Sequence, residues 1–152
     1  MPCSLLADTS IVYPSGGAFA TSTGDVLEVS CYGPGVFRLR AGPNTRPDYG
    51  IVTGRVKPCE IAQPAPDTWT FTSGDSTLEL AGSPLAFRLL WKGKPVTGSI
   101  TDRHFRGVTR LPAFGRVRAS PHWIASLALA SGEPVYGLGE KSVSLDKRWQ
   151  LV

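Results

Sequence analysis

The side chains able to perform acid–base, nucleophilic or metal chemistry in this sequence are few and far apart. The histidines are His104 and His122, and no serine lies in a Gly-x-Ser-x-Gly nucleophile elbow. A zinc site built on either histidine would need further ligands close to it in the fold. No Cys-x-x-Cys or zinc-finger spacing occurs, because Cys3, Cys31 and Cys59 are widely separated. The sequence therefore predicts no catalytic residue, no metal site and no cofactor.

Carboxylates are scattered along the chain rather than paired. Glycoside hydrolysis uses two facing carboxyl groups, about 5 Å apart in retaining enzymes and roughly 6.5–9.5 Å apart in inverting ones. Glu140 or Asp146 could meet a distant partner in the fold, but no local motif indicates it. The segment Gly137-Leu138-Gly139 lacks the third glycine of a phosphate-binding loop, because Ser142 stands at that position. A phosphate site is therefore not predicted.

Aromatic side chains offer a different kind of chemistry, since a flat ring can stack on the C–H face of a sugar. Three tryptophans alternate with small or polar residues and are expected to fill a core: these are Trp69, Trp91 and Trp123. Trp149 lies beyond the last clear strand pattern, among charged residues. It is the best candidate for a ring that is exposed or that docks onto another domain.

The elements that must position these side chains are strands, because apolar and polar residues alternate with a period of two. Residues 25–32 and 37–41 alternate in this way and are joined by Gly33-Pro34-Gly35, a pattern that predicts a β-hairpin. Lys92-Gly93-Lys94 is expected to form another hairpin tip. Further alternating runs lie at residues 69–71, 77–80, 85–91 and 123–129.

Glycine and proline decide the fold class. The 17 glycines and 13 prolines interrupt nearly every window long enough for a helix, and they suit short strands joined by turns. We therefore predict an all-β fold, an antiparallel β-sandwich, that forms a single domain over residues 1–152. A chain of this length can bury one hydrophobic core that is stable without disulfides or a structural metal.

Charge and hydropathy exclude several classes of partner. Sixteen Lys and Arg against twelve Asp and Glu give a net charge of +4, which names no partner. The arginine-rich stretch 103–118 has only Phe105 and Phe114 interleaved, so no nucleic-acid surface is predicted. No run of about 18 apolar residues occurs, so no membrane span is predicted.

The cysteines and the amino terminus bear on location. An odd number of cysteines argues against a disulfide framework but leaves room for one bridge. Cys31 lies in a strand pattern and is expected to be a small buried hydrophobe. The first eight residues lack the basic start and long apolar centre of a signal peptide. Together these features predict a cytoplasmic location.

The last part of the chain is similar to a signature of glycoside hydrolase family 31. Glu133 to Lys141, followed by Leu145 to Arg148, resembles the family's aromatic-Gly-Leu-Gly-Glu-basic segment and its Leu-Asn/Asp-basic-Arg-Gly segment. Upstream, residues 35–40, 76–80 and 84–89 resemble strands of the same enzymes, so the resemblance runs from Gly24 to Arg148. Trp149 stands where the family usually has glycine, and residues 142–144 replace a turn that commonly contains Phe-Gly.

The resemblance implies a galactose-mutarotase-like sandwich at the amino terminus of an α-glucosidase or α-xylosidase. In that family the sandwich packs beside a (β/α)8 barrel, whose two aspartates act in a retaining mechanism. We therefore expect a non-catalytic domain, cut off before its barrel, that supports the barrel and shapes substrate access. The expected partners are the downstream barrel and an α-linked oligosaccharide or glycoside. The residues expected to face the barrel or the substrate are Asp146, Lys147, Arg148 and Trp149.

Two other functions stay open. A stand-alone carbohydrate-binding module would need an exposed aromatic platform or a concave polar face. A sugar epimerase of mutarotase type would need His104 or His122 to converge with Glu140 on one sugar. The resemblance also implies strands beyond this stretch, and their absence would leave an open sheet edge and uncovered apolar side chains. We therefore expect the fragment to self-associate.

Overall fold

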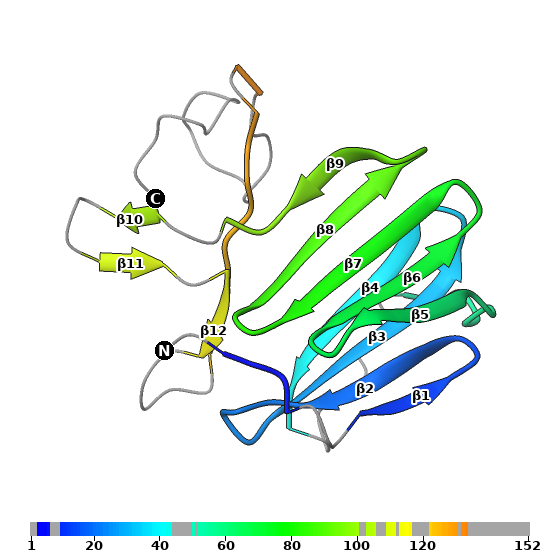
Figure 1. The fold of residues 1–152 in the computed structure, drawn as a ribbon, viewed down its shortest axis with the longest axis horizontal. Helices are drawn as coiled ribbons and strands as arrows, with labels where there is room; N and C mark the ends of the chain where they lie inside the picture. The colour runs from blue at the N-terminus through cyan, green and yellow to red at the C-terminus, as the bar shows by residue number, and fades with distance from the viewer. Residues whose placement is uncertain are drawn as a thin grey trace.

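A computed structural model describes residues 3–6, 10–43, 50, 52–100, 103–105, 109–111, 113–116, 122–130 and 132–133. For residues 103–105, 109–111 and 116 it describes the backbone alone. Thirteen strands and no helix occur in this part of the chain (Figure 1). None of the described residues forms a helix that could cross a membrane. All strand pairs are antiparallel, which confirms the predicted all-β, antiparallel fold class.

Most of the strands form two meandering sheets in which each strand pairs with the next along the chain. The first sheet consists of β1 (Ile11–Tyr13), β2 (Gly16–Ala20), β3 (Val26–Gly33) and β4 (Val36–Gly42). The second consists of β5 (Glu60–Ala65), β6 (Thr68–Ser73), β7 (Ser76–Gly82), β8 (Leu85–Trp91) and β9 (Lys94–Gly98). Two short ladders follow, β10 (Arg103–Phe105) with β11 (Thr109–Leu111), and β12 (Phe114–Arg116) with β13 (Trp123–Ala125).

Both predicted hairpins are confirmed. Strands β3 and β4 pair across the turn at Pro34–Gly35, where Gly35 has a φ of 74° that favours glycine. Strands β8 and β9 pair across Lys92–Gly93, with φ of 50° and 72°. Positive φ at both central residues is the requirement of a type I′ turn, whose twist matches that of the flanking strands.

The core lies where β3 of the first sheet meets β6 of the second. Leu27, Val29 and Cys31 of β3 are fully buried, as their alternation predicted. They pack in one cluster with Phe71 on β6 and Leu80 on β7. Burial of each large apolar side chain contributes about 1.5–3 kcal/mol, so the facing strands hold the two sheets together.

The predicted core tryptophans divide into two groups. Trp69 and Trp123 are partly buried and pack against the core, and the Trp69 ring lies 5.2 Å from that of Phe19. Trp91 is 53% exposed, so its assignment to the core was wrong. Figure 1 shows the reason, because β4 and β3 lie behind β7, β6 and β5, whereas β8 and β9 extend past them to one side.

A disulfide joins Cys31 to Cys59, the single bridge for which the odd number of cysteines left room, so Cys31 is buried as expected but is not a free thiol. The two Cα atoms lie 6.4 Å apart, although 28 positions separate the residues in the sequence. The backbone N–H of Cys59 donates to the carbonyl of Pro14 over 2.9 Å, which holds this segment against the turn between β1 and β2. Cys3 remains a free thiol and is buried. Closing a loop of this length stabilises the fold by roughly 3–4 kcal/mol in the chain-entropy account.

Candidate functional site

The residues that the sequence singled out for the barrel-facing or substrate side are not among those that the structure describes. Asp146, Lys147, Arg148 and Trp149 lie outside the described residues, so their role stays a prediction. Glu140 lies outside them as well. His104 falls in β10, of which only the backbone is described, and His122 is exposed just before β13. The His–carboxylate convergence required for an epimerase therefore also stays a prediction.

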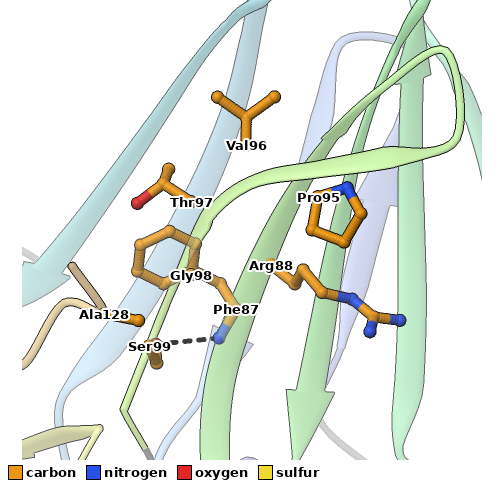
Figure 2. A pocket seen from close by; sticks show the side chains of 8 residues that line it. All are labelled: Phe87, Arg88, Pro95, Val96, Thr97, Gly98, Ser99 and Ala128. Atoms are coloured by element: carbon orange, nitrogen blue, oxygen red, sulfur yellow. Dashed lines mark hydrogen bonds between the residues drawn. The ribbon is translucent and has the colours of Figure 1, made fainter. Parts of the chain in front are cut away.

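A hollow of about 270 Å³ lies along the free edge of the second sheet. Figure 2 shows it between β8, β9 and the segment that follows β13. Its lining residues come from these three segments: they are Phe87, Arg88, Pro95, Val96, Thr97, Gly98, Ser99 and Ala128.

Main-chain hydrogen bonds shape the hollow by attaching residues 126–128 to the end of β9. The N–H of Ala128 donates to the carbonyl of Gly98 over 2.8 Å, and the N–H of Ile100 donates to the carbonyl of Ser126 over 2.9 Å. Ser99 fixes the same end to β8, because its hydroxyl accepts from the N–H of Phe87 over 3.1 Å. The outer edge of β9 is thus paired at its carboxyl end by a short extra segment.

Gly98 permits this close packing. A Cβ atom added at this position would lie 2.9 Å from the carbonyl oxygen of Phe87 and 3.3 Å from the Cα atom of Arg88. Both are backbone atoms and cannot rotate away, so any side chain here would push β9 from β8. The requirement for glycine therefore comes from the narrow separation of the two strands at the floor of the hollow.

The side-chain pattern of β13 was only partly predicted. Alternation over residues 123–129 indicated one continuous strand, but β13 ends at Ala125, and Leu127 forms only an isolated bridge with Ser99. Leu127 and Leu129 are consequently half exposed rather than buried.

The hollow is apolar in character and has few charged neighbours. Arg88 is the charged member of the lining, and its guanidinium is paired with Glu79 through an Nε–Oε2 distance of 2.7 Å. In Figure 2 the Arg88 side chain extends away from the Phe87 ring. The rings of Phe87 and Phe114 lie 5.6 Å apart, which continues the apolar lining towards β12.

This arrangement can accept an apolar group but offers no acid–base pair. The described residues of the lining include no carboxylate, imidazole or thiol. Among the described residues, no cluster of three or more His, Cys, Asp and Glu could hold a metal ion.

Exposed apolar side chains occur in the segments that line the hollow. Val96 of the lining is 61% exposed, and Leu127 and Leu129, the sequence neighbours of the lining residue Ala128, are 50% and 47% exposed. Large exposed aliphatic groups gathered beside a hollow are typical of a surface that another protein segment covers. Sequence alternation alone could not find this surface, because it does not reveal where the facing sheet ends.

A family model matches most of the chain. The model describes the glycosyl hydrolase 31 N-terminal galactose mutarotase-like domain, and it matches residues 26–152. The match starts at the first residue of β3 and includes the hollow. It confirms the resemblance found over residues 24–148 and the galactose-mutarotase-like fold. No curated protein matches the chain significantly.

Proposed function

The chain belongs to the family of glycosyl hydrolase 31 N-terminal galactose mutarotase-like domains, and we propose that it is the non-catalytic amino-terminal domain of an α-glycoside hydrolase. The parent enzyme would hydrolyse O-glycosyl bonds in a (β/α)8 barrel that follows in the same polypeptide. The sandwich would support that barrel and shape the access of an α-linked oligosaccharide or glycoside.

The observation that carries this proposal is the match of the family model to residues 26–152, and the apolar hollow at the edge of the second sheet is a surface that a following domain could cover. The described lining residues include no acid–base group, and Val96 among them is largely exposed. Covering such side chains gains about 25 cal/mol for each Å² of apolar surface removed from water. A domain that follows in the chain is a suitable cover, because covalent connection raises its effective concentration at the hollow.

The disulfide affects the proposed location. The cytoplasmic prediction depended on the odd cysteine count, on Cys31 as a buried hydrophobe and on the lack of a signal-peptide pattern, whereas Cys31 and Cys59 are joined. Disulfides persist in oxidising compartments and are rare in the cytosol. We therefore favour an oxidising compartment for the parent enzyme over the cytoplasm. Alkylation of the unreduced protein, followed by mass spectrometry, should label Cys3 alone after unfolding.

The proposed function is tested by comparing two polypeptides. One is this 152-residue chain, and the other is the product of the same reading frame continued beyond Val152. The chain alone should leave p-nitrophenyl α-glucoside and α-xyloside at the uncatalysed rate. The continued product should hydrolyse one of them with retention of anomeric configuration, as followed by NMR. Hydrolysis by the chain alone, or a continuation without a barrel and two catalytic carboxylates, would contradict the proposal.

A further inference from the structure

The tip of the β8–β9 hairpin carries an exposed ring in an unusual setting. Trp91 is the last residue of β8 and is 53% exposed. It lies on the same strand face as Phe87, four positions earlier, which packs against the core. The Trp91 side chain is therefore on the inward face of its sheet, but at a place that the first sheet does not cover. Lys94 is its direct cross-strand partner and is also exposed.

Lys92 has an unexpected conformation beside this ring. Its φ of 50° lies in the left-handed region, where turns of this type favour asparagine, aspartate or glycine. Two side-chain contacts accompany this conformation. The Nζ atom lies 4.9 Å from the centroid of the Trp91 ring and 3.6 Å from Oδ2 of Asp75. An asparagine side chain is too short to make both contacts, so the lysine adds to this turn two contacts that the usual turn residues could not make.

Asp75 belongs to the neighbouring turn between β6 and β7, and the two turns are attached to each other. The N–H of Lys92 donates to the carbonyl of Asp75 over 2.8 Å. The ring, the ammonium group of Lys92 and the carboxylate of Asp75 are thus held together by two adjacent hairpins, and Lys94 lies opposite the ring on β9. Such a framework is more rigid than a single exposed loop, which lowers the entropic cost of binding a ligand.

The chemistry of this group of residues matches a sugar. A pyranose presents a flat C–H face and a rim of hydroxyl groups, and an indole ring presents a flat apolar face. Charged donors and acceptors around the ring form stronger hydrogen bonds with hydroxyls than neutral ones do. We propose that Trp91, whose ring has the Lys92 ammonium over one face, binds one pyranose unit of a neutral oligosaccharide on its other face, with Asp75 and Lys94 beside it on the neighbouring turn and strand. The choice of an α-linked oligosaccharide as the probe rests on the proposed function.

The surroundings favour a sugar over a protein partner. Protein interfaces are depleted of Lys and Asp at their centres, because burying such groups removes their hydration. Trp91 is bordered by groups of this kind, with the side chains of Lys92 and Asp75 58% and 64% exposed. A bound sugar would leave them in water. The mouth of the hollow is different, since its exposed neighbours are aliphatic.

The experiment is a titration of the 152-residue chain with maltotetraose, followed by saturation-transfer NMR and calorimetry. We expect a Kd on the order of 1 mM, which is typical of a single stacked unit. Trp91→Ala should weaken binding at least about tenfold, and Trp91→Phe should weaken it less. Ile11→Ala, which also truncates an exposed apolar residue but lies on β1 of the other sheet, is the matched control and should change Kd less than about twofold. Near-UV circular dichroism establishes that each variant is folded.

Three outcomes would overturn the inference. These are no detectable binding by the wild-type chain, equal affinity in Trp91→Ala, or Trp91-dependent self-association that maltotetraose leaves unchanged. Asp75→Asn and Lys94→Met provide a second route should Trp91→Ala unfold, because each removes a charge beside the ring while the ring stays, and each should weaken binding. Failure here leaves the proposed function standing, since that function is tested by hydrolysis in the continued polypeptide.

Discussion

Strands β7 and β8 carry apolar residues in register on the same face of one sheet, but their surroundings differ along their length. Leu78 and Leu80 of β7 are fully buried, whereas their partners on β8, Leu89 and Phe87, are only partly buried. The series ends at Trp91, opposite Ser76, where the ring is mostly in water. The facing sheet covers β6 and β7 and does not reach β9 (Figure 1). The alternation of apolar and polar residues along a strand determines which face of the sheet a side chain is on. How far the opposite sheet extends determines whether that side chain is buried.

The largest expected effect comes from truncating a residue where the two sheets overlap. Leu80→Ala should lower the free energy of unfolding by about 2–5 kcal/mol, because it leaves a cavity in a fully packed site. Leu127→Ala, at the uncovered edge, should lower it by no more than about 0.5 kcal/mol. Urea denaturation followed by tryptophan fluorescence measures both. Similar losses would mean that the edge is as well packed as the centre.

The disulfide gives the next largest effect. Cys59→Ala should lower the free energy of unfolding by about 2–4 kcal/mol, because the unfolded chain loses a loop constraint. The control is Cys3→Ala, which removes a buried thiol without touching the bridge and should cost less than the loss of the bridge. Adding a reductant should destabilise the wild type and leave Cys59→Ala unchanged. A reductant that destabilises both variants equally would contradict the Cys31–Cys59 link.

How far the sequence predicts this molecule can be seen at three places. The hairpins at Gly33–Gly35 and Lys92–Lys94 were predictable because turn chemistry is local, and the burial of Leu27 and Val29 followed from alternation. The Cys31–Cys59 link was not, because the three-dimensional path of the chain brings the two residues together. The exposed ring and the hollow were missed for the same reason: each depends on where a distant layer ends.

The β9 edge of the second sheet should also mediate weak self-association, and this is the third largest effect that we expect. The mouth of the hollow exposes Val96 beside a β9 edge that residues 126–128 pair only at one end. Val96→Lys should weaken self-association about tenfold, because a charge on an edge strand discourages pairing with another copy. Stability should change by less than about 0.5 kcal/mol. Light scattering coupled to size-exclusion chromatography measures the mass, and a wild-type chain that stays monomeric at high concentration would contradict this expectation.

The smallest expected effect tests whether Lys92 is coupled to the ring at the hairpin tip. A double-mutant cycle with Trp91→Ala and Lys92→Ala should give a coupling free energy of about 0.5–1 kcal/mol, the range for an exposed cation–π contact. The parallel cycle of Lys92→Ala with Asp75→Ala should give less, because exposed ion pairs contribute little and salt screens them. A Trp91 coupling near zero would mean that the left-handed Lys92 gains nothing from the ring, and its conformation would then be a property of the turn alone. A coupling within the expected range would link the turn geometry to the surface that we assign to sugar binding, because the same ammonium group would order the ring and border its ligand.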